Sequence, residues 1–311
     1  KPKFRSIYGK SYGEVKRALV ALKSKALAAQ DQPAMLVYGD GSLSDWMSYW
    51  LDVTEKPYIR ETTYLLYRRS IEKHLVPWLG GYPLRELSPA HIQAMVDELH
   101  RMGFEVMLWI CPFISPDTRV SRELADKGLP IRDRSGEVAI KKWWNGYSAV
   151  LDLSHPQAIA WMRAQLDSLM ARYGVDGCKF DAGDPYFYNA AHDITYAPIT
   201  ENGQAAAWAK LGAEYAYNEF RACFASANLP LVQRLHDKCH EWGEAGMASL
   251  IPNQLCQGIQ GYAFTCPDMV GGGMLGSFHG EGFQLDEELF VRYAQCAALS
   301  PMIQFSAAPW R

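Results

Sequence analysis

From about residue 95 onward, short apolar runs alternate with amphipathic helical patterns. Glu105–Phe113 is such a run, and Pro156–Met170 then repeats apolar residues at helical spacing. Continuous apolar runs are typical of parallel strands buried on both faces, and strand–helix alternation favours a (β/α) barrel. The pattern therefore predicts an α/β fold. The remaining segments expected to be regular are the strands Asp176–Asp181, Leu229–Leu235, Gly261–Cys266 and Met302–Ser306 and the helix Ala205–Ala227.

Polar side chains follow several of these predicted strands. The most informative case is Lys179–Asp184, where a run ends in two carboxylates. The carboxyl ends of barrel strands meet at one mouth, which is where barrel enzymes place their active sites. Two separated carboxylates are what retaining glycoside hydrolysis requires, one as nucleophile and one as proton donor. The polar residues that end the predicted strands are Asp181, Asp184, Arg234, Asp237 and Asp268.

Residues 1–94 have a different composition. They carry 14 Lys or Arg against 9 Asp or Glu, whereas residues 95–311 carry 17 against 25. Their pattern is helical, with segments expected at Ser11–Lys23, Ser42–Leu51 and Arg60–Leu75 and a fourth opening at Ser88. We therefore expect a small all-α domain before the α/β domain, with a boundary near residue 95.

The bulk composition limits the class of protein. The seven cysteines include no C-x-x-C pair, which favours reduced thiols over a disulfide scaffold or a zinc site. No 18-residue apolar run indicates a membrane span, and no apolar stretch of a signal peptide follows the first residues. We therefore expect a cytoplasmic protein without a bound metal.

The first region resembles the N-terminal core-binding, SAM-like part of phage-type tyrosine recombinases. Thr63–Gly80 and Pro83–Gln93 carry the resemblance, together with Ser44-Asp-Trp46. It implies an arm-like segment over 1–40 and a core-binding-like domain over 41–94 that grips duplex DNA through its backbone. An ordinary solvated helix face is the alternative. Recombinase catalysis is not expected, because no His-x-x-Arg is followed at a distance by a nucleophilic Tyr. The implied phosphate contacts are Lys16, Arg17, Arg68, Arg69 and Lys73.

Residues 95–311 are similar to the catalytic barrel of glycoside hydrolase family 31. Four blocks carry the resemblance: Gly103–Phe113, Trp144–Ser154, Tyr173–Asp184 and Tyr262–Gly272. The segment from Arg234 to Asp237 most resembles the branch that contains α-galactosidases. The family implies hydrolysis of α-glucosides or α-galactosides by double displacement, with a carbohydrate as partner and no cofactor.

Position by position, the resemblance implies that Asp181 is the nucleophile and Asp237 the general acid/base. Each has an alternative: Asp181 could be a structural acid paired with Lys179, and Glu244 is a rival for the acid. The tryptophans could simply pack the barrel. The positions that match substrate-binding residues are Trp109, Trp144, Lys179, Asp184, Arg234 and Asp268.

Against the family, the barrel of this chain is expected to be partial. Members place their first two barrel strands before the helix predicted at 96–104, and a final helix after the last strand. We therefore expect a partial TIM (β/α)8 barrel, truncated at both ends, whose chemistry is encoded but weak or lost in the isolated chain. The alternative function is a DNA-binding integrase fragment fused to a passenger hydrolase segment.

Overall fold

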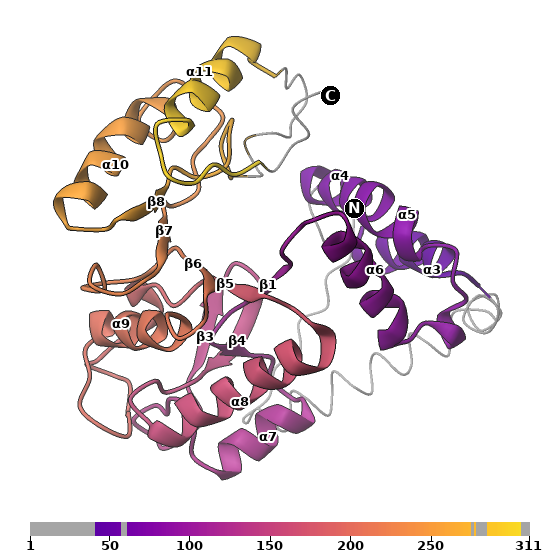
Figure 1. Ribbon diagram of the computed structural model, residues 1–311. Coiled ribbons are helices and arrows are strands. Elements are labelled where there is room, and N and C mark those ends of the chain that lie inside the picture. Colours follow the sequence, from indigo (N-terminus) through magenta and orange to yellow (C-terminus); the bar gives the residue numbers. More distant parts are fainter. Residues whose placement is uncertain (1–40, 57–60, 275–276, 278–284, 306–311) are drawn as a thin grey trace, which may run out of the picture. The chain divides into compact units, whose positions relative to one another are not determined.

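The computed structural model describes residues 41–56, 61–274, 277 and 285–305 (Figure 1). The chain divides into two compact units, Lys1–His91 and Ile92–Arg311. The expected helix Ser11–Lys23, with Lys16 and Arg17, lies outside the described residues. Within the described ranges, none of the helices has both the length and the apolar character needed to cross a membrane.

The described part of the first unit is helical, as the sequence predicts. Ser42 caps the first helix: its Oγ accepts from the Asp45 backbone N–H, and the Asp45 carboxylate accepts from the Ser42 N–H at 3.0 Å. Leu51, Tyr64 and Ile71 form its small core. The elements are α3 (Leu43–Tyr49), η1 (Trp50–Glu55), α4 (Glu61–Ser70), η2 (Ile71–Leu75), α5 (Val76–Leu79) and η3 (Leu84–Glu86).

Helix α6 (Pro89–Arg101) runs through the boundary expected near residue 95. The sequence predicts two helices here, one opening at Ser88 and one over 96–104, and that division is wrong. Between Pro89 and Gly103 the chain contains no helix-breaking Pro or Gly, so a single helix continues. Pro89 opens the helix, where its missing N–H costs nothing.

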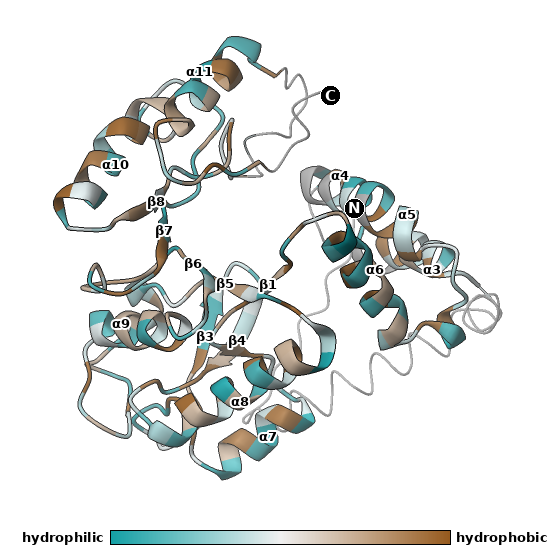
Figure 2. Cartoon of the chain, viewed as in Figure 1, coloured by the Kyte–Doolittle hydropathy of each residue, from teal (hydrophilic) through white to brown (hydrophobic). Residues whose placement is uncertain are grey.

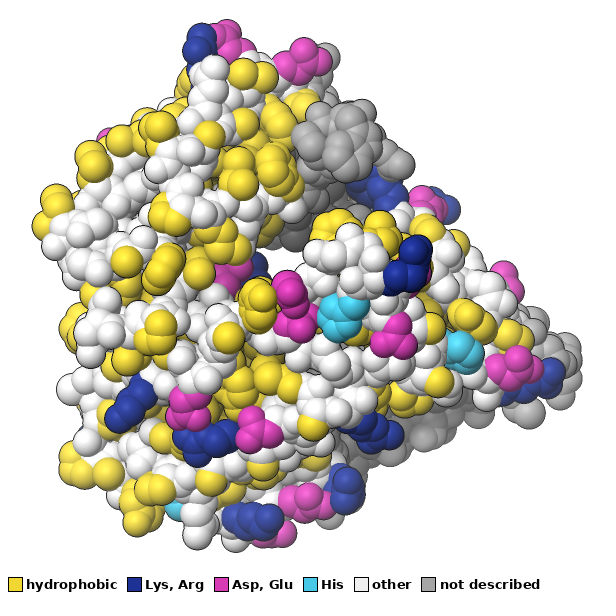
Figure 3. Space-filling view, in the orientation of Figure 1, with side chains coloured by type: hydrophobic (Ala, Val, Ile, Leu, Met, Phe, Trp, Pro, Cys, Tyr) yellow, Lys and Arg dark blue, Asp and Glu magenta, His cyan; other side chains and the backbone are white. Residues whose placement is uncertain are grey.

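The second unit is built on a five-stranded parallel sheet in the order β1-β5-β6-β7-β8. Helices lie between most of the strands along the chain, and Figure 2 shows hydrophobic and hydrophilic residues alternating around α8. Figure 3 shows hydrophobic side chains gathered over α10 and α11. The strands are β1 (Met107–Ile110), β5 (Gly177–Phe180), β6 (Tyr217–Phe220), β7 (Val232–Arg234) and β8 (Phe264–Cys266). The helices are α8 (Pro156–Tyr173), α9 (Glu201–Gly212), α10 (Leu250–Ile259) and α11 (Glu287–Ala297).

The two faces of the sheet differ in chemistry. Cys178 and Phe180 belong to the main hydrophobic core, which also contains Leu166 of α8 and Trp208 of α9. Successive strand residues point to opposite faces, so Lys179 points away from this core. The parallel register aligns Trp109 with Lys179 and Lys179 with Glu219, forming a row of polar or amphipathic side chains across three strands. All three residues lie one position before the carboxyl end of their strands.

A three-stranded antiparallel sheet lies outside the predicted pattern. It has the order β2-β4-β3 and follows β1 along the chain, with α7 (Arg119–Asp126) between β2 and β3. It brings Phe113 and Trp143 face to face, with ring centroids 4.2 Å apart. Its strands are β2 (Phe113–Ile114), β3 (Ile140–Trp143) and β4 (Gly146–Val150).

Three details of the strand prediction are wrong. Ala205–Ala227 is not one helix, because α9 ends at Gly212 and β6 follows it. Strand β1 is not buried on both faces, since Trp109 is 48% exposed. The strand expected over Met302–Ser306 is also wrong, since within the described residues 302–305 only Gln304 pairs, in an isolated bridge with Met269. Among the described residues, β1 and β8 each have one sheet neighbour, so the sheet is open, in agreement with the expected partial barrel.

The pairing of β5 with β6 depends on a glycine. A Cβ on Gly177 would lie 1.9 Å from the Tyr217 carbonyl oxygen, the register partner in β6. We expect Gly177→Ala to lower the free energy of unfolding by about 1–3 kcal/mol in urea titrations, because backbone atoms must shift. In the matched control Gly258→Ala, within α10, a Cβ meets nothing within 4 Å, and stability should rise slightly. Equal effects of the two variants would contradict the β5–β6 register.

Candidate active site

Asp181 lies directly after β5, and two donors hold its carboxylate. The Trp109 Nε1–H donates to Oδ2 at 2.7 Å, and the Ala182 backbone N–H donates to Oδ1 at 2.9 Å. Ala182 has a positive φ of 55°, an uncommon backbone conformation for alanine, directly after the carboxylate. These two hydrogen bonds fix the orientation of the carboxylate. The side chain is mostly buried but keeps 12% of its surface exposed.

Arg221, the residue after β6, connects Asp184 to Asp181. Its guanidinium binds the Asp184 carboxylate in a bidentate manner, with Nε donating to Oδ1 at 3.2 Å and Nη2 to Oδ2. The same Nε lies 3.8 Å from Asp181 Oδ1. The guanidinium also stacks over the Trp144 ring, 4.6 Å from its centroid. Arg221 therefore places a fixed positive charge beside the proposed nucleophile.

Arg234, at the end of β7, is buried among three carboxylates. Its Nη1 donates to Asp237 Oδ1 at 2.8 Å and to Asp268 Oδ1 at 2.6 Å. Its Nε lies 3.0 Å from Glu219 Oε1. The Arg234 side chain is 2% exposed and that of Asp237 is 28% exposed, so Asp237 is the one member of the three that faces outward.

The pKa values of Asp237 and Asp268 are shifted in opposite directions by their surroundings. Burial alone would raise the pKa of Asp237, but the positive charges of Arg234 and Arg221 outweigh burial and hold it below its usual value. Burial raises the pKa of Asp268, and Arg234 offsets this only in part.

Asp268 is completely buried, and its oxygens are engaged inside the protein. Oδ2 accepts from the backbone N–H groups of Lys238 at 2.7 Å and Gly273 at 2.8 Å, while Oδ1 accepts from Arg234. It thus ties the loop after β8 to the loop after β7. Its expected contact with substrate stays a prediction, as do the roles of the other site residues. Glu244, the rival acid, is exposed in the loop before η5 (Met247–Ser249).

Exposed aromatic rings adjoin the carboxylates. Trp109 and Trp144 are 48% and 52% exposed, and both contact Trp143, with ring centroids 6.4 and 5.1 Å apart. Tyr186, in the 3-10 turn η4 (Pro185–Phe187), is 66% exposed. Solvent-exposed ring faces next to an acid pair suit stacking on the apolar face of a sugar. The alternative that both tryptophans merely fill the core does not fit these exposures.

Sequence reasoning missed Glu219 and Arg221. Glu219 lies in β6 with its Oε1 3.5 Å from Lys179 Nζ, and Arg221 follows the same strand. Both were hidden because residues 205–227 were expected to form a helix. The local pattern gives no signal for the strand, since the aromatic residues Tyr217 and Phe220 are three positions apart and do not alternate with polar residues at a period of two.

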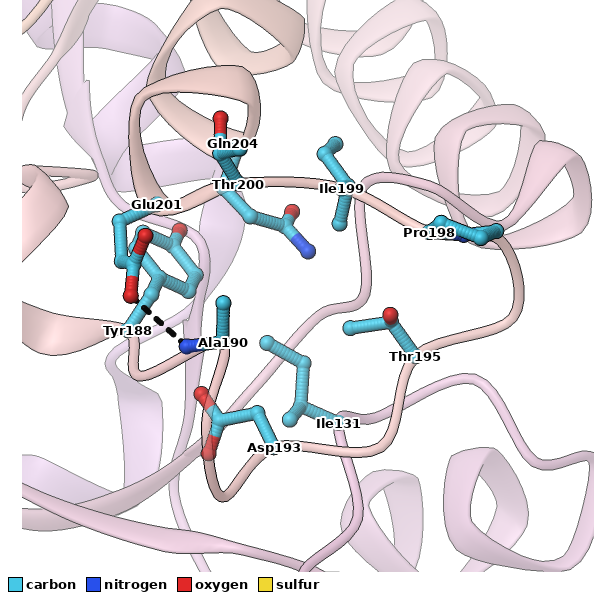
Figure 4. A pocket seen from close by; sticks show the side chains of 10 residues that line it. All are labelled: Ile131, Tyr188, Ala190, Asp193, Thr195, Pro198, Ile199, Thr200, Glu201 and Gln204. Atoms are coloured by element: carbon cyan, nitrogen blue, oxygen red, sulfur yellow. Dashed lines mark hydrogen bonds between the residues drawn. The ribbon is translucent and has the colours of Figure 1, made fainter.

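A cavity of about 420 Å³ lies beside this site, not over it (Figure 4). It is bordered by the loop after η4 and the start of α9, where Glu201 accepts a hydrogen bond from the Ala190 N–H at 2.8 Å. The buried Tyr188 hydroxyl has no hydrogen-bond partner among the described residues. None of the proposed catalytic carboxylates lines the cavity.

Among the described residues, a cluster with metal-ligand spacing occurs at the opposite end of the sheet. Ligand atoms of His100, Glu105 and Asp176 lie within 4.8 Å of one another. Asp176 Oδ2 is already hydrogen-bonded to His100 Nε2 at 2.8 Å and accepts from the Val106 N–H at 2.7 Å. These contacts explain the cluster as a link between α6 and the starts of β1 and β5.

The family models identify both parts of the chain. Residues 85–310 match the glycosyl hydrolases family 31 TIM-barrel domain, which is well over half of the chain. The chain belongs to glycoside hydrolase family 31. Residues 42–100 match the phage integrase N-terminal SAM-like domain, so both predicted resemblances are confirmed. The two matches overlap on α6.

The relatives agree with the family assignment. Myogenesis-regulating glycosidase from Mus musculus is 31% identical over 297 residues, covering 90% of this chain and 41% of that protein. The aligned part exceeds the second unit, so it includes part of the first. SITS-binding protein from Tetronarce californica is 32% identical over 213 residues, covering 65% of this chain and 29% of that protein. The chain thus spans less than half the length of these relatives.

A solved structure supports the predicted fold class. A family 31 sulfoquinovosidase from E. rectale superimposes with a TM-score of 0.61 at 21% identity, covering 70% of this chain and 34% of that one. The α/β barrel class predicted from the sequence is therefore confirmed, with an open sheet in the described residues.

The described residues expected to contact DNA are exposed but not strongly basic in their surroundings. Arg68 pairs with Glu72 at 3.1 Å and lies over the Tyr64 ring. Arg69 and Lys73 are exposed on the same stretch of helix. Within 41–56 and 61–91, Lys and Arg number five against six Asp and Glu, so the basic excess of the first region lies in its undescribed residues.

Proposed function

We propose that this chain carries the catalytic site of a retaining α-glycosidase, with Asp181 as nucleophile and Asp237 as general acid/base. The observation that supports this most is the placement of Asp181 at the mouth end of β5, held by Trp109 and Ala182, with Arg221 beside it. A carboxylate that is fixed in orientation and open to one side suits attack on an anomeric carbon.

Asp237 supplies the proton transfer in both steps of the reaction. Asp237 donates its proton to the leaving oxygen as Asp181 forms the glycosyl-enzyme bond. It then takes a proton from the water that cleaves this bond, which returns both carboxylates to their starting states. Bound sugar excludes water from Asp237, which raises its pKa and counteracts the effect of Arg234. Since the free carboxyl has a lowered pKa, turnover should be favoured in mild acid.

The charges at the mouth favour an uncharged substrate. Five carboxylates, those of Asp181, Asp184, Glu219, Asp237 and Asp268, share the site with four cations, Lys179, Arg221, Arg234 and Lys238. A net negative site repels an anionic sugar. We therefore propose a neutral α-galactoside or α-glucoside as substrate, in contrast to the enzyme from E. rectale, which is named a sulfoquinovosidase.

A panel of aryl glycosides tests this function. We expect release of the aryl group from the α-galactoside or α-glucoside, with retention at the anomeric carbon in the NMR spectrum of the first product. The aryl sulfoquinovoside should react more slowly, because its sulfonate meets the excess of carboxylates. Preference for the sulfonated substrate would contradict the neutral-substrate assignment alone.

The second candidate is duplex DNA binding by the first unit, which the integrase-like match favours. Failure of every α-glycoside, together with salt-sensitive duplex binding that Arg68→Ala/Arg69→Ala abolishes, would replace the glycosidase proposal with this one. Charge-neutralising binding of this kind weakens steeply with added salt.

A further inference from the structure

Glu219 is the buried carboxylate at the centre of the site that no part of the proposed reaction uses. Its side chain is 5% exposed. Oε1 lies 3.5 Å from Lys179 Nζ and 3.0 Å from Arg234 Nε, and Oε2 accepts a hydrogen bond from the Gln304 amide. It therefore connects the cation of β5 to the cation of β7 from the strand between them.

Three carboxylates, those of Glu219, Asp237 and Asp268, share the guanidinium of Arg234. Lys179 lies beside Glu219, while Arg221 acts on Asp237 and Lys238 acts on Asp268. Carboxylates that share one cation compete for its charge, so each receives less stabilisation of its ionised form than it would alone. Of the three, Asp237 is the most exposed, with its side chain 28% accessible.

We propose that Glu219 is a positioning residue that keeps Asp237 competent as a proton donor by competing with it for Arg234. This inference rests on the proposed function. Arg234 meets Glu219 through Nε and Asp237 through Nη1, so the one guanidinium charge is divided between them. Without the charge of Glu219, Arg234 would be shared by two carboxylates instead of three, and Asp237 would stay ionised to lower pH.

Other charged groups around Asp237 also determine its pKa in the wild-type protein. Arg221 and His236 lower the pKa of Asp237 together with Arg234, against the raising effect of burial. Asp268 shares the same Arg234 Nη1. Glu219 differs from Asp268 because Asp268 also binds two backbone N–H groups, so its replacement would disturb two loops.

Glu219→Gln is a suitable probe because it removes the charge and keeps the shape. The Gln304 amide can turn to accept a hydrogen bond from the new amide nitrogen. The pKa of Asp237 is measured by NMR titration of protein labelled with ¹³C at aspartate carboxyl carbons, with the resonance assigned by its loss in Asp237→Asn. This measurement needs no turnover, so it remains informative if the glycosidase proposal fails.

We expect the pKa of Asp237 to fall by about one unit in Glu219→Gln. Lys179→Met removes a cation instead and should raise it, and this variant carries the test if Glu219→Gln does not fold. The control Glu214→Gln removes a carboxylate that pairs with Arg163 on the surface and should leave the pKa unchanged. In enzyme that turns over substrate, the alkaline limb of kcat/KM should move to lower pH in Glu219→Gln.

An unchanged or raised pKa of Asp237 in Glu219→Gln would overturn the proposal, as would a fall in Lys179→Met. Lower activity at every pH without displacement of the alkaline limb would show that Glu219 is merely structural. If the wild-type chain hydrolyses no α-glycoside but both pKa shifts of Asp237 occur as expected, the proposed glycosidase function is refuted. The competition of Glu219 and Asp237 for Arg234 is then still supported.

Discussion

Asp181→Asn should reduce turnover of an aryl α-glycoside by about 10³-fold or more, because no other group can form the glycosyl-enzyme bond. The change is nearly isosteric. The new side chain can still accept one of the two hydrogen bonds that Trp109 and Ala182 donate to the carboxylate. Circular dichroism and urea titration should therefore show a folded protein of similar stability, and the loss should lie in kcat.

Two further variants test whether the loss of turnover is specific to Asp181. Asp126→Asn changes an exposed aspartate at the end of α7 and should leave turnover unchanged. Asp184→Asn weakens the pairing with Arg221 and should reduce turnover less than Asp181→Asn. If Asp184→Asn is the more damaging of the two, the nucleophile has been assigned to the wrong carboxylate.

The sequence predicts those features of the fold that depend on the residues of a single continuous segment. The segment expected to be a strand before Asp181 ends at the acid, one residue after β5 ends, so both the strand and the acid could be located from the sequence. The helix expected from Ser42 likewise forms, and the capping box of Ser42 and Asp45 that opens it lies within four residues. In these cases, local chemistry and the final structure require the same residues.

Other features depend on neighbours that are distant in the sequence. Tyr217–Phe220 becomes a strand because β5 and β7 leave a place for it between them, although it follows an alanine-rich helix. Glu219 and Arg221 were missed for this reason. The burial of Asp268 is also a tertiary result, since its partners Arg234 and Lys238 come from the end of β7 and the loop after it. Periodicity contains no information about such pairings.

Arg234→Met should lower the free energy of unfolding at pH 7 by about 3–5 kcal/mol, the cost of removing one partner from a buried ion cluster. Glu219, Asp237 and Asp268 would be left without their shared cation. Urea titrations of the wild-type chain and the variant measure the difference. Arg292→Met provides the control, because Arg292 is 54% exposed and pairs with Glu288 on the surface of α11. Its loss should cost less than about 1 kcal/mol.

The difference between wild type and Arg234→Met should depend on pH with a definite sign. In the wild type, the pKa of Asp237 is lowered in the folded state, so its stabilisation is present above the unfolded pKa and is lost as pH falls through the folded pKa. In the variant, unpaired buried carboxylates have raised pKa values, so the variant loses stability as pH rises through them. The two effects widen the gap from acid toward neutral pH. A gap that does not change with pH would mean that Arg234 acts through packing alone, and that its three carboxylates do not share its charge.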